Sequence, residues 1–287
     1  MSAPDAVLLI AFGLLGLVIG SFLNVVIHRL PRQLEHQWQA EAHSLLGLPL
    51  DAPPAPNVVF PGSHCPQCEQ PLSWWHKVPV LSYLALRGRC AHCHAPIGWH
   101  YPAVELMSAL WWTLCALQFG GDALTALWWA GWGSVLLCLA WIDARTFLLP
   151  DALTLPLLWA ALLWSTLAPE GLSASAALWG AALGYALLAL PALLYHRVTG
   201  REGMAAGDFK LLAAIGASLG PWRLPSVLLL ACLMGLLWAA MAHARQVRAG
   251  HARLSSDTPI PFGPALALAA LMTQMGGLRA LGLEWLP

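Results

Sequence analysis

Three aspartates stand beside long apolar runs, where a charged side chain is energetically costly. Asp143 and Asp151 lie in "LAWIDARTFLLPDALTLP", and Asp208 lies with Lys210 in "MAAGDFKLLAAIG". An ionisable residue in such a place is a candidate functional group. Two carboxylates held close together cannot both ionise easily, so one keeps a proton while the other activates water. The sequence therefore contains the parts of an aspartic protease dyad.

Each of these residues also has a structural interpretation. Asp151 opens "DALTLP", where it can cap the helix that follows. Asp143 is harder to explain as a loop residue, because it ends a long apolar run. Gly207 directly precedes Asp208, and its missing side chain lets another helix or a substrate backbone approach closely. Lys210 can extend to lipid phosphates, or it can contact the substrate or an aspartate.

Four cysteines form a second group, with a spacing that suits a metal. They stand in two C-x-x-C pairs within "HCPQCEQPLSWWHKVPVLSYLALRGRCAHCH": Cys65, Cys68, Cys90 and Cys93. Each C-x-x-C turn directs two thiolates at one point, and tetrahedral Zn²⁺ takes four such ligands. A closed site of four thiolates leaves no open position for catalysis, so this metal is expected to be structural.

Disulfides and free or redox-active thiols are the alternatives for this cluster. We expect the segment to face the reducing cytosol, which disfavours disulfides. Three nearby histidines are alternative ligands: His64, His92 and His94. The remaining cysteines fall in apolar runs and are expected to be packing residues: Cys115, Cys138 and Cys232.

The composition is that of a membrane protein. The 287 residues are 59% hydrophobic and 10% charged, with mean hydropathy +0.65, which is unlike an ordinary soluble domain. Runs of about 20 apolar residues can cross a bilayer. Eight such runs occur, at 6–27, 102–119, 123–142, 152–168, 172–195, 207–222, 225–242 and 261–281. We therefore predict an all-α fold, a polytopic bundle of about eight transmembrane helices.

The first apolar run is expected to be a retained helix rather than a signal peptide. Only Asp5 is charged before it, and it is longer than the hydrophobic region of a signal peptide. Orientation follows from the basic residues, which concentrate on the cytoplasmic side. With the N-terminus outside, twelve of the 14 Lys and Arg lie inside, and only Arg223 and Arg279 lie outside. Both termini are then periplasmic, and all three aspartates lie near the cytoplasmic face.

A long polar interval, from about 28 to 101, interrupts the apolar pattern. Its first part has weak periodicity and many prolines, so we expect it to be largely irregular. We divide the chain into a first transmembrane helix at 1–28, a cytoplasmic insert with the four-cysteine knuckle at 29–101, and a transmembrane bundle at 102–287. No internal repeat is evident. The formal net charge is zero, so no attraction to nucleic acid is indicated.

In their order along the chain, several motifs resemble those of the type IV prepilin peptidases, the bifunctional leader peptidase/N-methyltransferases of bacterial type IV pilus and type II secretion systems. The matching stretches are "GSFLNVVIHRLP", the two C-x-x-C pairs, "GRCAHCHAPIGWHYPAVEL", "DARTFLLPDALTLP" and "EGMAAGDFKLLAAIGA". One position departs from the resemblance. Ala205 stands where the family has the first glycine of G-x-G-D, and a positive φ there would strain an alanine.

The resemblance implies an eight-helix bundle in the bacterial inner membrane with a cytoplasmic zinc-binding insert. It implies that type IV prepilins and type II secretion pseudopilins lose their basic leaders near the cytoplasmic face, with Asp143 and Asp208 as the catalytic pair. It also implies N-methylation of the new amine by S-adenosylmethionine, within roughly 13–118. No glycine loop of the Rossmann type marks the methyl-donor site. Glu105 in "YPAVEL" is a candidate polar group there, and an interfacial charge is its alternative interpretation.

Two other functions remain open from the residues alone. Carboxylates in membrane helices also relay protons in transporters, although broken helices and inverted repeats are then expected. A non-catalytic assembly factor would use the cysteine knuckle for docking. Incubation with a prepilin separates the three, because leader loss and methyl addition both change its mass.

Overall fold

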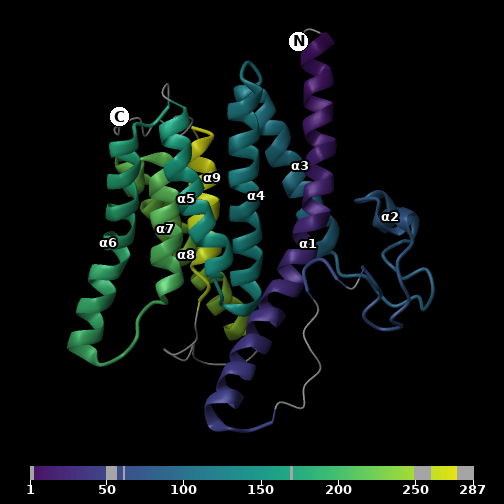
Figure 1. Ribbon diagram of the computed structural model, residues 1–287, viewed down its shortest axis with the longest axis horizontal. Coiled ribbons are helices and arrows are strands. Elements are labelled where there is room, and N and C mark those ends of the chain that lie inside the picture. Colours follow the sequence, from purple (N-terminus) through teal and green to yellow (C-terminus); the bar gives the residue numbers. More distant parts are fainter. Residues whose placement is uncertain (1–2, 50–56, 61, 169–170, 249–259, 277–287) are drawn as a thin grey trace. The chain divides into compact units, whose positions relative to one another are not determined.

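The computed structural model describes residues 3–49, 57–60, 62–168, 171–248 and 260–276 (Figure 1). The chain divides into two compact units, 1–138 and 139–287. The first holds α1 (Ala3–Leu46), η1 (Trp74–Lys77), α2 (Leu81–Ala85), α3 (His100–Phe119) and most of α4 (Ala123–Thr146). The second holds the end of α4, then α5 (Asp151–Leu167), α6 (Ala174–Thr199), α7 (Ala206–Leu219), η2 (Pro221–Arg223), α8 (Leu224–Arg248) and α9 (Gly263–Gln274).

The predicted all-α membrane fold is confirmed. A helix lies in each of the eight predicted spans, of which residues 277–281 of the last lie outside the described residues. The described residues contain isolated bridges but no strand. In the part of the chain that the structure describes, four helical segments are long and apolar enough to cross a membrane: Ala6–Leu46, Ala123–Thr146, Ala174–Thr199 and Pro221–Ala244. The count of eight spans is therefore approximate, since α5, α7 and α9 have only 17, 14 and 12 residues.

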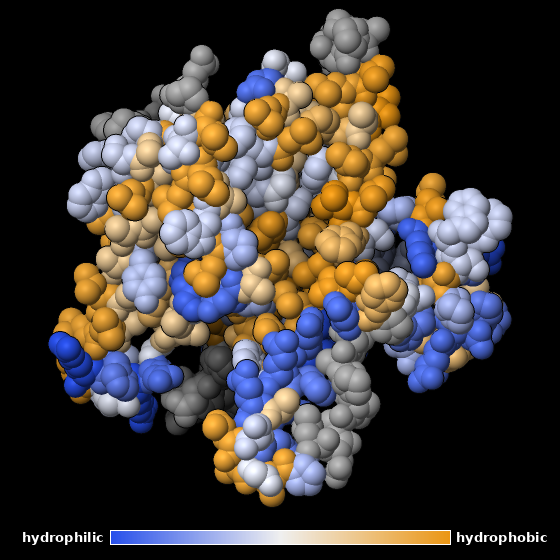
Figure 2. Space-filling model, in the orientation of Figure 1, coloured by the Kyte–Doolittle hydropathy of each residue, from blue (hydrophilic) through white to orange (hydrophobic). Residues whose placement is uncertain are grey.

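The first helix is longer than the sequence predicted. Residues 33–46, the first part of the stretch 33–62 that was expected to be largely irregular, continue α1 to Leu46. Beyond Pro31 the chain reads "RQLEHQWQAEAHSLL", which is rich in strong helix formers. Gly47, with φ 64°, follows the helix end in a conformation that glycine adopts at little cost. Figure 2 shows an apolar surface over the N-terminal part of α1 and a mainly hydrophilic one over its extension, with apolar atoms at the far end.

Glycines bring α1 against α3 in the first unit. A Cβ on Gly16 would lie 2.7 Å from the Cα of Ala109, and one on Gly20 would lie 2.6 Å from the Cα of Glu105. Small residues let two helix backbones approach this closely in a membrane protein. The contact places the start of α3, including Glu105, beside the middle of α1.

The short helix α7 forms the core of the second unit. Ten of its 14 residues are buried, and it packs against α5, α6 and α9. On the α6 side, a Cβ on Gly180 would lie 2.0 Å from the carbonyl oxygen of Gly216, and one on Gly184 would lie 2.5 Å from that of Leu212. Because α7 is enclosed by other helices, the residue in its first turn, Asp208, is carried into the protein interior.

Candidate active site

Asp143 is a buried carboxylate held by the start of a helix far along the chain. It lies in the last turn of α4 and is 5% exposed. Its Oδ2 accepts a hydrogen bond of 2.9 Å from the backbone N–H of Gly263, the first residue of α9. The first N–H groups of a helix have no partner within it, and the helix dipole favours a negative charge there. The N-terminus of α9 therefore fixes the orientation of this carboxylate.

Position 263 has no room for a side chain. A Cβ there would lie 2.7 Å from Oδ2 and 3.0 Å from Cγ of Asp143. Sequence reasoning missed this residue. The stretch "FGPAL" does indicate that a helix begins at this position, because a glycine followed by proline at the edge of an apolar run is typical of a helix start. Nothing in the pattern connects that start to Asp143.

Asp208 is the second buried carboxylate of the site. It lies in the first turn of α7 and is 8% exposed. Its Oδ1 is buried and has no hydrogen-bond partner among the described residues, a condition that is costly unless a proton, water or ligand compensates it. Its carboxyl interacts electrostatically with that of Asp143. The structure thus brings together Asp143 and Asp208, which the sequence singled out as a pair.

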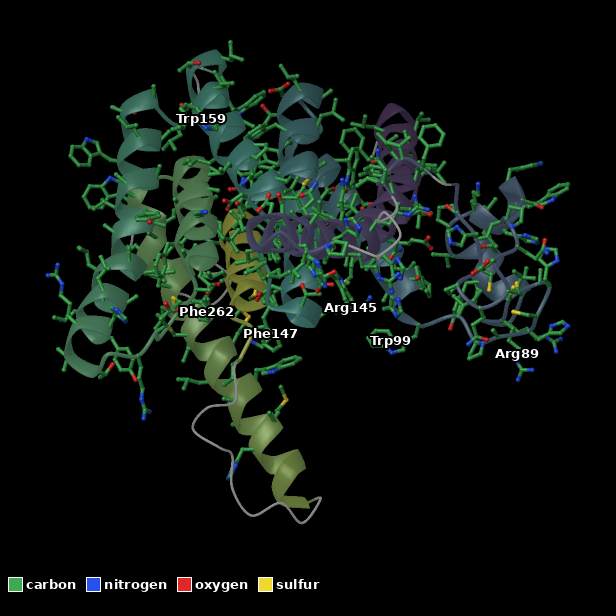
Figure 3. The ribbon with its side chains drawn as sticks, turned by 60° about the horizontal axis from the view of Figure 1, so that its bottom comes forward. Arg89, Trp99, Arg145, Phe147, Trp159 and Phe262 are labelled. Carbon is green, nitrogen blue, oxygen red and sulfur yellow. The ribbon has the colours of Figure 1, made fainter. Side chains whose placement is uncertain are left out.

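The loop between α4 and α5 closes over the start of α7. Phe147 begins this loop with φ 55°, and its N–H donates to the carbonyl oxygen of Asp143 at 2.9 Å. Such a conformation is uncommon for an aromatic residue, and similar strain recurs at functional sites. Leu149 then lies against Gly207, where a Cβ would come within 2.9 Å of the Leu149 Cβ. The sequence predicted that another part of the structure approaches Gly207 closely, and this part is the α4–α5 loop. Phe147, at the start of the loop, is labelled in Figure 3.

Ala205 causes no backbone strain. It is the N-cap of α7, with φ −76° and ψ 145°, an ordinary extended conformation. An alanine adopts these angles freely. The departure from G-x-G-D is accommodated in this chain because the position does not need a positive φ.

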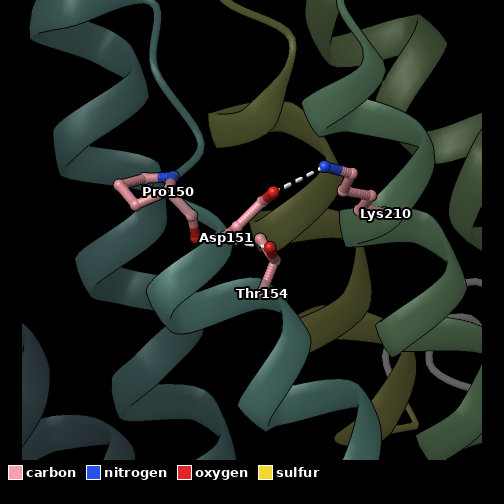
Figure 4. A network of polar contacts seen from close by, with 4 residues as sticks. All are labelled: Pro150, Asp151, Thr154 and Lys210. Carbon is pink, nitrogen blue, oxygen red and sulfur yellow. Dashed lines mark hydrogen bonds and ion pairs between the residues drawn. The ribbon is translucent and has the colours of Figure 1, made fainter. Parts of the chain in front are cut away.

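Asp151 pairs with Lys210 at the protein surface. The Lys210 Nζ donates to both carboxylate oxygens of Asp151 at 2.7 Å (Figure 4), and the side chains are 31% and 54% exposed respectively. The prediction that Asp151 caps its helix is wrong. Pro150 holds the N-cap position of α5, and no side chain makes a capping bond there. An exposed pair of this kind contributes about 0–1 kcal/mol, so its main effect is to connect the starts of α5 and α7.

The four cysteines of the first unit meet at one point. The Sγ atoms of Cys65, Cys68, Cys90 and Cys93 all lie within 4.8 Å of one another, and those of Cys65 and Cys93 are 3.8 Å apart. A Zn²⁺ ion with bonds of about 2.3 Å to four tetrahedral thiolates separates the sulfurs by about 3.8 Å. The donor set fits zinc, and no histidine joins the cluster among the described residues.

The backbone around the cluster repeats in its two halves. The N–H of Cys65 donates to the Gln70 carbonyl and that of Cys90 to the Ala95 carbonyl, at 3.0 and 2.8 Å. Four residues after the first cysteine of each pair, Glu69 and His94 both have φ 56°. This local repeat was not visible in the sequence, because the residues between the cysteines differ.

The thiols have unequal proton affinities. Backbone N–H groups of Cys93 and His92 lower the pKa of Cys90 to about 6. The N–H of Ala95 acts in the same direction on Cys93, but desolvation and the neighbouring thiols outweigh it and raise the pKa of Cys93 to about 11. Four thiolates cannot share one point without a counter-charge, and a divalent cation supplies it.

The cysteines outside the cluster behave in two ways. Cys115 and Cys138 are buried, as expected for packing residues. Cys232 is exposed on α8, so the packing prediction is wrong there.

Glu105 anchors the region between the cysteine pairs to α3. It is buried, and its Oε2 accepts a 2.7 Å hydrogen bond from the N–H of Val80. Val80 has φ 59°, a rare conformation for a β-branched residue. Two further contacts fasten the first unit: Asn24 Nδ2 donates to the Tyr101 carbonyl at 3.0 Å, and Arg29 Nη1 donates to the Asn57 carbonyl at 2.9 Å. Glu105 is thus buried and hydrogen-bonded, not an exposed interfacial charge.

Purified protein should contain about one zinc ion per chain, because four convergent thiolates complete its coordination. Replacement of Cys68 by Ser removes one ligand, so the metal content should fall and the insert should become more sensitive to protease. Cys232→Ser is the matched control and should keep the metal. Elemental analysis of freshly prepared protein measures both variants, and a metal-free wild-type protein would contradict the assignment.

Comparisons with known proteins agree along the chain. Two protein-family models match the chain. The family model described as "Bacterial Peptidase A24 N-terminal domain" matches residues 14–119, and the one described as "Type IV leader peptidase family" matches residues 130–240. No solved structure matches the chain.

Curated relatives named prepilin leader peptidase/N-methyltransferase match most of the chain, among them the proteins of three organisms. The one from Pseudomonas aeruginosa is 46% identical over 275 residues, which cover 92% of this chain and 89% of the relative. That from Stutzerimonas stutzeri is 43% identical over 286 residues, with 96% and 93% covered. That from Dickeya chrysanthemi is 45% identical over 271 residues, with 92% and 91% covered. This chain therefore belongs to the type IV leader peptidase family.

Proposed function

We propose that the chain is an inner-membrane aspartic endopeptidase that removes the leader of type IV prepilins and N-methylates the new N-terminal residue. Family membership and the relatives' names support both activities. The observation that carries the peptidase assignment is the buried pair of Asp143 and Asp208 on two helices of one unit. We do not include Asp151 in the pair, because it is half exposed and bound to Lys210.

The geometry gives the two carboxyls different tasks. Asp143 already accepts an N–H hydrogen bond at a helix N-terminus, which stabilises its ionised form. Asp208 has a buried oxygen without a partner among the described residues, so it is the better holder of the shared proton. The attacking water transfers a proton to Asp143 while its oxygen bonds to the scissile carbonyl carbon. Asp208 donates its proton to the carbonyl oxygen, which gives a tetrahedral gem-diol. As the C–N bond breaks, Asp143 passes the proton taken from water to the leaving amine, and Asp208 takes one back from a diol hydroxyl.

The position of the pair suits a substrate that is itself an apolar helix with a basic leader. Asp143 lies at the end of α4 and Asp208 at the start of α7, so both are at helix ends rather than at mid-membrane. The bias of twelve basic residues against two supports a cytoplasmic site and periplasmic termini. Pseudopilins of type II secretion carry the same kind of leader and are included as substrates.

Methyl transfer is assigned to the N-terminal region, roughly 13–118, with S-adenosylmethionine as the donor of an electrophilic methyl group. No residue is assigned to the donor's contacts. We further propose the division into 1–28, the zinc-bearing insert at 29–101 and the peptidase bundle at 102–287. Since the zinc shapes the insert, Cys68→Ser is expected to reduce methylation more than cleavage.

Asp143→Asn and Asp208→Asn should each reduce leader cleavage by about 10²–10⁴-fold or more. An asparagine keeps the size of the side chain but neither takes the proton from water nor shares one with its partner. The double variant should be no slower than either single variant, because the two groups act as a unit. Cleavage of a prepilin is scored by mass, in detergent or membranes, with protein level checked by blotting.

Asp151→Asn is the matched control and should keep substantial activity. Methylation of a pre-cleaved pilin should persist in all of these variants, since that step does not need an activated water. Normal cleavage by well-expressed Asp143→Asn protein would refute the pairing and leave Asp151 as the next partner to consider for Asp208.

Gly263→Ala should lower kcat for cleavage by about 100-fold, because the added Cβ displaces the Asp143 carboxylate. KM should change little, since Gly263 contacts a catalytic group. Gly235→Ala on α8 is the matched control, because a Cβ there meets nothing closer than the Phe262 ring at 3.7 Å. Equal kcat values for Gly263→Ala and the wild type would show that this glycine does not position Asp143.

A further inference from the structure

The segment between the two cysteine pairs exposes large apolar side chains. Trp74, Trp75, Leu81 and Leu84 lie in this segment and Trp99 follows the second pair; each is between 60% and 70% exposed. Trp74 and Trp75 stack with ring centroids 4.3 Å apart, and Figure 2 shows apolar atoms at the upper edge of the insert, where α2 lies in Figure 1. Soluble surfaces rarely gather so many apolar groups unless they contact a partner or a membrane.

The same segment is basic. Between residues 73 and 89 the chain contains Lys77, Arg87 and Arg89 but no aspartate or glutamate, and all three cations are exposed. We call the four apolar residues between the cysteine pairs and these three cations the aromatic–basic surface; Figure 3 labels Arg89 in the insert and Trp99 apart from it. Tryptophan is enriched at the headgroup level of bilayers, and anionic lipids attract lysine and arginine.

A tether holds this surface at a defined depth. The N–H of Val80, between η1 and α2, donates to the Oε2 of Glu105 at 2.7 Å. Glu105 lies five residues after the start of α3, which is about 7.5 Å along the helix axis. The headgroup region on each side of a bilayer is about 5–8 Å thick. If α3 enters the membrane near its first turn, α2 is held within the headgroup layer.

From the tether, the exposed tryptophans and the unopposed cations we propose that the aromatic–basic surface rests on anionic phospholipid headgroups of the membrane face that carries the insert. The four-cysteine knuckle is the rigid base of this surface, because η1 and α2 lie between its two pairs. The proposal uses the membrane placement of the proposed function but not its peptidase chemistry. Loss of cleavage in an aspartate variant therefore leaves it unaffected.

Photocrosslinking in the full-length protein tests this contact. Benzoylphenylalanine is placed at position 84 or at position 67, the latter being an exposed residue of the first cysteine turn. The protein is irradiated in nanodiscs of phosphatidylethanolamine and phosphatidylglycerol, and adducts are identified by mass. We expect lipid adducts at position 84, several-fold more than at 67, and fewer when phosphatidylcholine replaces phosphatidylglycerol.

A second variant separates surface contact from loss of folding. Trp74→Ala/Trp75→Ala, with the probe still at position 84, should reduce lipid adducts several-fold while the zinc content stays unchanged. Equal lipid adducts at 84 and 67 would overturn the proposal. So would a principal adduct to a polypeptide, either an added prepilin or a second copy of the chain, because the surface would then be a protein-docking site.

Discussion

The hydrogen bond between the Gly263 N–H and Asp143 is the contact around which the second unit is arranged. A carboxylate buried without a partner costs several kcal/mol, whereas a hydrogen bond to a charged group returns about 1.5–3 kcal/mol. The bond at 2.9 Å thus offsets part of the cost of burying Asp143. The rest of this burial cost is removed if Asp143 and Asp208 hold one proton between them. This shared proton is the chemical basis of the proposed reaction.

The helices around the site keep the carboxyls of Asp143 and Asp208 buried. Glycine contacts between α6 and α7 let the short α7 lie inside the unit. Asp208, in the first turn of α7, is therefore buried. The α4–α5 loop fits over Gly207 because that residue has no side chain. The Asp151–Lys210 pair is different in kind. It is partly exposed and worth about 0–1 kcal/mol, so it orders the surface beside the site without contributing to the burial of charge.

Much of this arrangement follows from elementary features of the sequence. Asp143 and Asp208 stood out because charge beside apolar runs is costly, and the cysteines stood out because their spacing suits one metal. The role of Gly263 was not predictable, since its donor is a backbone group 120 residues from Asp143. The extension of α1 was not predicted, because residues 32–46 have strong helix formers but weak apolar periodicity and are followed by several prolines. The partner of Asp151 was also hidden, because local spacing suggested a helix cap.

The pH dependence of kcat/KM for leader cleavage tests the shared-proton pair most directly. Activity should fall at low pH, where both carboxyls are protonated and no base remains, and at high pH, where both are ionised and no proton donor remains. The account predicts a bell-shaped profile over the range in which circular dichroism shows unchanged helix content. A profile that only rises or only levels off across that range would contradict it.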